Sequence, residues 1–160
     1  MLVKRAMSKN VVSVSVPGNR EKVLDLMRKE DKAVLPVVKG DTKQLVGLIT
    51  RSDLIVNPDE EQIAILMSTD LVTASPDDDV ADVAKKMIDN NVRRVPVVDD
   101  NGDLVGIITS FDLVSNALIK LESDDPVENF MITTVPTTWY KTPLNVAFET
   151  MKQFGLKSVL

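Results

Sequence analysis

Two stretches of this chain carry the same order of apolar and polar positions, about 60 residues apart. Leu35-Pro36-Val37-Val38 recurs as Val95-Pro96-Val97-Val98, and Leu45–Thr50 recurs as Leu104–Thr109. The offset shifts by one residue between the two blocks, which a single deletion in the intervening turn explains. A repeat of this length indicates a supersecondary element that buries its apolar face against a neighbouring copy.

The pattern within each repeat predicts the element order β-α-β-β-α. Apolar residues within 80–88 recur at helical spacing, as they do within 23–27. Turn residues separate pairs of short apolar runs, which predicts hairpins. The predicted strands are 11–14, 34–38 and 45–49 in the first repeat, and 71–74, 95–98 and 104–108 in the second. Neither hairpin can bury both faces alone, so we expect an α+β fold in which two small sheets pack against each other with helices outside.

A third copy begins at Met131 and stops before its strands. Leu144, Ala147 and Met151 repeat the helical spacing of the earlier copies, but the sequence ends where the proline strand would begin. We therefore expect repeats at 1–58 and 59–122 and a truncated third repeat at 123–160. The sequence resembles a fragment of a protein with four repeats, and its unpartnered apolar stripe predicts self-association.

Composition narrows the chemistry. The chain of 160 residues has no cysteine and no histidine, which excludes disulfides, Cys/His zinc sites and triads that need either residue. A net charge of −5 argues against a nucleic-acid partner. The sequence has no apolar run near the roughly 20 residues that span a bilayer, and Met1–Asn10 has no signal-peptide core. We expect a cytoplasmic protein with no membrane partner.

The candidate binding residues stand where the last strand of each repeat meets the following helix. Thr50 and Asp53 form a Thr-x-x-Asp pattern in the first repeat, and Thr109 and Asp112 form it in the second. As a structural feature this pattern predicts a capping box. The same helix start has unpaired N–H groups that suit a phosphate, and the carboxylate can accept hydrogen bonds from ribose hydroxyls.

These features resemble the CBS-domain family. The residues that carry the resemblance are 95–98, 106–112 and their counterparts in the first repeat. It covers Met7–Val56, Met67–Ala117 and the truncated copy from Met131. The resemblance implies a Bateman module, in which two repeats pair and enclose two clefts. In that family the clefts often bind AMP, ADP, ATP or S-adenosylmethionine.

The resemblance also implies roles for individual residues. By position, Asp53 and Asp112 would hold ribose, and Thr50 and Thr109 would lie near phosphate or ribose. The residues implied to lie beside adenine, each in the partner repeat's site, are Ser13 and Thr73.

Arg93 and Arg94 directly precede the proline strand of the second repeat. Family members that bind phosphorylated nucleotides often carry basic residues here, and two solvated arginines are the alternative. The first repeat has Ala33-Val34 at the matching positions. We therefore expect two unequal clefts, with Arg51 available to compensate in the first.

Three other clusters have a simpler structural interpretation. Asp77-Asp78-Asp79 could hold a metal ion, but acids at a helix start stabilise the helix dipole, so we expect capping. Asp99-Asp100 is typical of a turn. Trp139-Tyr140 could stack on a ligand or pack within its own repeat. We expect no metal site and no catalytic residue.

The combined interpretation is a regulatory module that senses an adenosine-type ligand, needs no other cofactor and is not an enzyme. The main alternative is a dimerisation scaffold with empty clefts. An enzyme is disfavoured because the sequence offers no evident nucleophile–base pair. The resemblance further implies a homodimer, and the partner that such a module would regulate is an unknown effector protein.

Overall fold

The computed structural model describes residues 1–118, 125–154, 156 and 159. The chain divides into two compact units, Met1–Leu121 and Glu122–Leu160. The predicted boundary between residues 122 and 123 lies outside the described residues. Each unit is described by itself.

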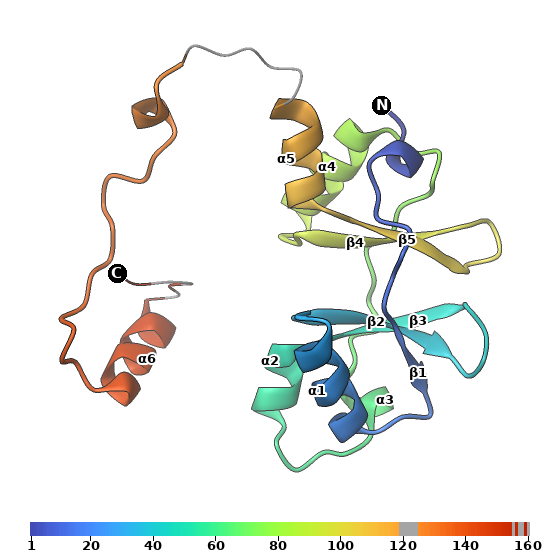
Figure 1. Ribbon diagram of the computed structural model, residues 1–160, viewed down its shortest axis with the longest axis horizontal. Helices are drawn as coiled ribbons and strands as arrows, with labels where there is room; N and C mark the ends of the chain where they lie inside the picture. The colour runs from blue at the N-terminus through green and yellow to red at the C-terminus, as the bar shows by residue number, and fades with distance from the viewer. Residues whose placement is uncertain (119–124, 155, 157–158, 160) are drawn as a thin grey trace. The chain divides into compact units, whose positions relative to one another are not determined.

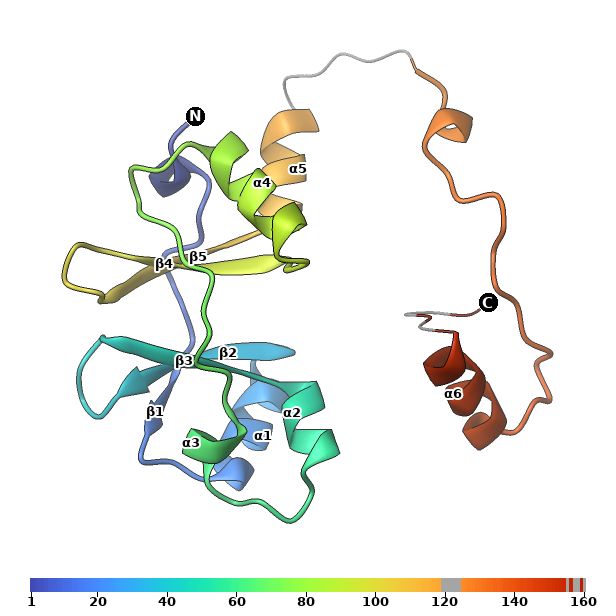
Figure 2. The same ribbon diagram turned by 180° about the vertical axis from the view of Figure 1, so that it is seen from behind.

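Two small β-sheets face each other in Met1–Leu121, with helices on their outer sides (Figures 1 and 2). In the first sheet β1 (Val14–Val16) is parallel to β2 (Val34–Lys39), which is antiparallel to β3 (Leu45–Thr50). In the second, β4 (Arg94–Val98) is antiparallel to β5 (Leu104–Thr109). The predicted α+β fold is confirmed.

The first strand of each repeat differs from the prediction. In the first repeat it begins at Val14 instead of residue 11. In the second repeat the expected strand 71–74 is reduced to one bridge between Ala74 and Val97. The second sheet therefore has two full strands where the first has three.

Polar side chains cap the starts of α1 and α4, and the second cap agrees with the role predicted for Asp77-Asp78-Asp79. Asn19 accepts a hydrogen bond from the Lys22 N–H at the start of α1, and Asp79 accepts one from the Ala81 N–H at the start of α4. The helices of this unit are α1 (Arg20–Lys29), α2 (Arg51–Val56), α3 (Ile63–Leu66), α4 (Val80–Asp89) and α5 (Ser110–Leu118), with a 3-10 turn η1 (Val3–Arg5).

Each sheet closes a separate hydrophobic core, and each core takes residues from the other repeat. Ile63 and Leu66 lie near the start of the second repeat, yet they are buried with the first sheet. Val3 lies near the start of the first repeat, yet it is buried with the second sheet. We call Val3–Ser8 and Ile63–Ser68 the lead-in segments. Because the repeats exchange them, neither core is complete without the other repeat's lead-in segment.

The lead-in segments are also tied to the sheets by backbone hydrogen bonds. Ser8 exchanges two with Ile107, at 2.9 and 3.0 Å, and Ser68 exchanges two with Leu48, at 2.8 and 2.9 Å. The two hairpins are also linked to each other, because the Leu104 N–H of the second repeat donates to the Lys43 carbonyl of the first at 2.8 Å.

A methionine in each lead-in segment lies over a glycine of the last strand. A Cβ added to Gly47 would lie 2.5 Å from the Met67 sulfur. At Gly106 it would lie 2.5 Å from the Met7 sulfur and 3.2 Å from the Ser8 carbonyl oxygen. The methionine of each lead-in segment therefore occupies the space that the Cβ of a larger residue would take in the Gly-x-x-Thr run.

The unit Glu122–Leu160 contains a 3-10 turn η2 (Val127–Asn129) and the helix α6 (Leu144–Gln153). The helix expected for a third repeat is thus present. The rings of Trp139 and Tyr140 meet edge to face, with centroids 5.5 Å apart. Among the described residues of this unit, none contributes to either hydrophobic core.

We expect deletion of residues 127–160 to leave the two-repeat unit folded, because both cores are complete without them. Thermal unfolding followed by circular dichroism should remain cooperative, with a midpoint close to that of the whole chain. A non-cooperative transition in the shortened protein would show that the deleted segment belongs to the core.

We expect Gly106→Ala to lower the free energy of unfolding by about 1–3 kcal/mol, because the new methyl group overpacks the Met7 contact. In a Met7→Ala background part of that cost should disappear, giving a coupling of about 0.5–3 kcal/mol. Urea denaturation of the two single variants and the double variant measures the coupling. Strictly additive losses would contradict the contact.

Candidate functional site

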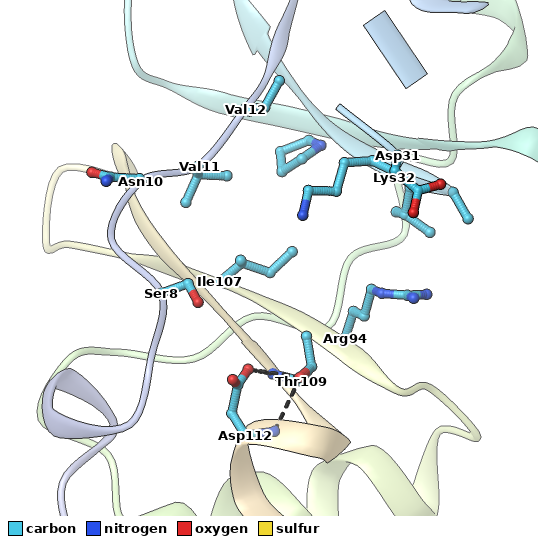
Figure 3. A pocket seen from close by; sticks show the side chains of 13 residues that line it. Ser8, Asn10, Val11, Val12, Asp31, Lys32, Arg94, Ile107, Thr109 and Asp112 are labelled. Carbon is cyan, nitrogen blue, oxygen red and sulfur yellow. Dashed lines mark hydrogen bonds between the residues drawn. The ribbon is translucent and has the colours of Figure 1, made fainter. Parts of the chain in front are cut away.

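A cavity of about 320 Å³ lies between the two repeats, beside Thr109 and Asp112 (Figure 3). Its other walls come from the chain after the first lead-in segment and from the turn that follows α1. The lining residues are Ser8, Asn10, Val11, Val12, Asp31, Lys32, Ala33, Val34, Pro36, Arg94, Ile107, Thr109 and Asp112. Both repeats are therefore needed to form it.

Thr109 and Asp112 adopt the reciprocal geometry that their spacing predicts. The Thr109 N–H and hydroxyl donate to Oδ2 of Asp112 at 2.8 and 2.6 Å, and the Asp112 N–H donates to the Thr109 hydroxyl at 3.2 Å. The second carboxylate oxygen, Oδ1, makes no hydrogen bond to the described residues. It is therefore available to accept one from a ligand hydroxyl.

Two basic side chains line the cavity, one from each repeat. Arg94 is brought beside Thr109 by the strand register, because these residues are partners in the β4–β5 pair. Lys32 follows Asp31, whose φ of 48° turns the chain out of α1. Figure 3 shows Arg94 between Thr109 and the Asp31-Lys32 turn. The cavity thus combines two cations with the carboxylates of Asp31 and Asp112.

The structure separates the two arginines that the sequence analysis grouped together. Arg94 lines the cavity, whereas Arg93 lines a groove on the outer side of α4 and α5 with Ile88 and Val114. The Arg93 carbonyl accepts a hydrogen bond from the Ser110 N–H at 2.9 Å. Arg93 precedes β4, whereas Arg94 is its first residue, so the two side chains have different backbone settings.

Ser13, which the resemblance implied for the site at Thr109, does not line this cavity, whereas Val11 and Val12 of the same segment do. Ser13 lines two other hollows, one of which also includes Leu104 of the second repeat. The resemblance implied Thr73 for the cleft at Thr50. The Thr73 carbonyl accepts a hydrogen bond from the Lys86 ammonium at 3.4 Å.

Thr50 and Asp53 have the same geometry as Thr109 and Asp112 but do not line this cavity. The Thr50 N–H and hydroxyl each donate to Asp53 Oδ2 at 2.8 Å, which completes the predicted capping box. Arg51, expected to compensate for a missing charge, donates from Nη2 to the Lys32 carbonyl at 3.2 Å.

The sequence analysis did not identify Ser8 at the end of the first lead-in segment, Asn10 just after it, or Lys32 in the turn after α1 as lining residues. A basic residue in the first repeat was detectable from the sequence. The positions equivalent to Arg93 and Arg94 are Ala33 and Val34, and Lys32 directly precedes them. Ser8 and Asn10 left no signal, because their place depends on the exchange of lead-in segments.

The acidic clusters have structural roles. Asp78 forms an ion pair with Lys86 at 3.0 Å, and Asp99 accepts hydrogen bonds from the N–H groups of Asn101 and Asp103 within its turn. Within the part of the chain that the structure describes, no His, Cys, Asp or Glu cluster has the arrangement of a metal site. None of the described helices is long and apolar enough to cross a membrane.

The sequence pattern of the CBS domain matches the chain at residues 3–59 and again at 61–118. Among curated proteins, an uncharacterized protein of Methanocaldococcus jannaschii, MJ0188, is 30% identical over 120 residues. That alignment covers 74% of this chain and 44% of the relative, so the chain spans less than half the relative's length.

Two solved structures resemble the two-repeat unit. The CBS domain pair of protein MJ0100, in complex with 5-methylthioadenosine and S-adenosyl-L-methionine, is 32% identical with a TM-score of 0.66, and covers 74% of this chain and 99% of that one. The protein CBSX2, in complex with AMP, is 25% identical with a TM-score of 0.67, and covers 75% and 98%. Both neighbours hold adenosine-type ligands.

We expect Asp112→Ala to lower the free energy of unfolding by about 0.5–2 kcal/mol, because the N–H and hydroxyl of Thr109 lose their acceptor. Asp53→Ala is the matched variant, since it removes the same bonds at Thr50 and should cost a similar amount. Urea denaturation measures both. If Asp112→Ala left stability unchanged, the capping role at this site would be wrong.

Proposed function

We propose a regulatory function for this chain, which belongs to the CBS domain family. Its paired repeats form a module that binds an adenosine-type ligand in the cavity beside Thr109. The observation that carries the proposal is the coincidence of four features in one cavity. These are the Asp112 carboxylate, of which only Oδ2 accepts hydrogen bonds from Thr109, the Thr109 hydroxyl, and the cationic groups of Arg94 and Lys32.

Each part of an adenine nucleotide has a chemical counterpart in the cavity. The Oδ1 atom of Asp112 suits a ribose hydroxyl. The apolar side chains of Val11, Val12 and Ile107 suit the adenine ring. Arg94 and Lys32 suit a phosphate. AMP, ADP, ATP and S-adenosylmethionine share the adenosine part, and the two cations favour the phosphorylated members.

Thr50 and Asp53 remain our proposed ribose contacts for a second cleft. Their geometry matches that of Thr109 and Asp112. Thr73 stays the proposed adenine contact of that second cleft. Arg93 and Ser13 were proposed for binding by resemblance alone, and neither lines the cavity at Thr109. Two unequal sites follow from this proposal, with the stronger one at Thr109.

We further propose that the chain acts as a homodimer in the cytoplasm, controls an effector protein and catalyses no reaction. Self-association is supported by the exposed apolar side chains on the outer face of α4 and α5. Ile88 is 79% exposed and Val114 is 52% exposed, and both line the same groove. Exposed apolar side chains that share one face favour burial against another surface.

A scaffold with empty clefts is the second candidate, because an apolar outer face serves association with or without a ligand. Ligand linkage separates the two. A sensor saturated at 100 times its Kd gains about 2.7 kcal/mol of stability, whereas a scaffold gains none.

We expect Arg94→Ala to weaken AMP binding by about tenfold or more, because a charge-assisted hydrogen bond contributes about 1.5–3 kcal/mol. Adenosine, which lacks the phosphate, should bind the variant and the parent equally. Isothermal titration calorimetry with both ligands measures the difference.

Arg93→Ala is the matched control for that experiment, because it removes the same charge one residue away, outside the cavity. Its affinity for AMP should equal that of the parent. Equal losses of AMP and adenosine affinity in Arg94→Ala would disprove the phosphate contact. If the parent bound neither compound, the scaffold would be the better interpretation.

A further inference from the structure

The two repeats differ at the corner between the first strand and the first helix. In the second repeat an ion pair fills it, because the Lys86 ammonium donates to Asp78 Oδ2 at 3.0 Å and to the Thr73 carbonyl at 3.4 Å. The hydrogen bond from Lys86 holds the pKa of the Asp78 carboxyl below the usual value of an aspartate. The residues 60 positions earlier are Leu26 and Gly18, which carry no charge.

A hollow of about 460 Å³ lies at this corner of the first repeat. It is bounded by β1, by the Pro17–Asn19 turn and by one side of α1, and it shares no lining residue with the cavity beside Thr109. Gly18 fits closely there, since an added Cβ would lie 2.5 Å from the Ser15 carbonyl oxygen. The absence of the Lys–Asp pair leaves this corner unfilled.

The walls of the hollow have two chemical characters. Its base is apolar, because Val23 and Ile63 line it and both are buried. Its rim is polar and includes Lys22 and Lys29, which lie seven residues apart on α1 and so share one side of the helix. The rim also carries Asp25 and two serines, Ser13 and Ser15.

The two lysines are available to a ligand. Asp25 lies between them, but the Arg28 guanidinium already pairs with it at 3.7 Å. No ion pair to Lys22 or Lys29 is found among the described residues. An apolar base below two cations is complementary to a molecule with an apolar body and one anionic group.

We propose that this hollow is a second ligand site, specific to the first repeat, that binds a small amphipathic anion such as a short-chain carboxylate. The apolar part of the ligand lies on Val23, Leu26 and Ile63, and its carboxylate pairs with Lys22 and Lys29. The site is independent of adenosine binding, because the two sets of residues do not overlap.

Titration of the ¹⁵N-labelled whole chain with hexanoate, followed by amide NMR shifts, tests the proposal. Saturable shifts are expected at the amides of Ser15, Gly18 and Leu26. Hexan-1-ol has the same apolar body without the charge and should bind more weakly. Hexanoate affinity should fall roughly five- to tenfold in the Lys22→Ala/Lys29→Ala variant, as expected for two partly exposed charge pairs.

Two further variants sharpen the test. Leu26→Lys introduces the side chain found at the equivalent position of the second repeat, and it should abolish the shifts by filling the hollow. Lys85→Ala removes an exposed lysine of the second repeat and should leave binding unchanged. The proposal is wrong if hexanoate gives no saturable shifts at these amides, if hexan-1-ol binds equally well, or if the double variant binds hexanoate as the parent does.

Discussion

The exchange of lead-in segments is the constraint on which the rest of the two-repeat unit depends. Val3 is fully buried in the core of the second repeat, and Ile63 is buried in the core of the first. Because each core is completed from the other half of the sequence, the two repeats fold as one unit. The exchange also creates the cavity, since the chain crosses from one core to the other sheet through Ser8–Val12, which form its wall.

Repeats with the same pattern nevertheless give unlike surfaces. The hairpin and the capping bonds at Thr50 and Thr109 occur in both repeats. The charged side chains around this framework differ between the repeats. Lys32 and Arg94 give the cavity beside Thr109 two positive charges. In the first repeat Leu26 and Gly18 take the positions of the Lys86–Asp78 pair, and a hollow lies there. Duplicated packing therefore leaves each repeat able to acquire a separate binding surface.

Features set by residues close in sequence were predictable, whereas features that depend on the exchange of lead-in segments were not. The hairpins and the Thr109–Asp112 capping bonds depend on residues close in sequence, so periodicity and spacing were sufficient. Ile63 lies within the predicted second repeat, 59–122, and pattern alone does not show that the core of the first repeat buries it. The separation of Arg93 from Arg94 was not predictable from the pattern, because the predicted strand began after both residues, whereas β4 begins at Arg94. The contribution of Lys32 required the turn geometry at Asp31.

Three segments of the chain share the same turn hydrogen bond, but its apolar residue is buried in only two of them. The Met7 N–H donates to the Val3 carbonyl at 2.8 Å, and the Met67 N–H donates to the Ile63 carbonyl at 2.9 Å. Within the unit Glu122–Leu160, the Met131 N–H makes the same bond to the Val127 carbonyl at 2.9 Å. Val127 is nevertheless 75% exposed, whereas Val3 and Ile63 are at most 1% exposed. The turn therefore forms from its own hydrogen bond, whereas the burial of Val3 and Ile63 comes from the hydrophobic core that each residue joins.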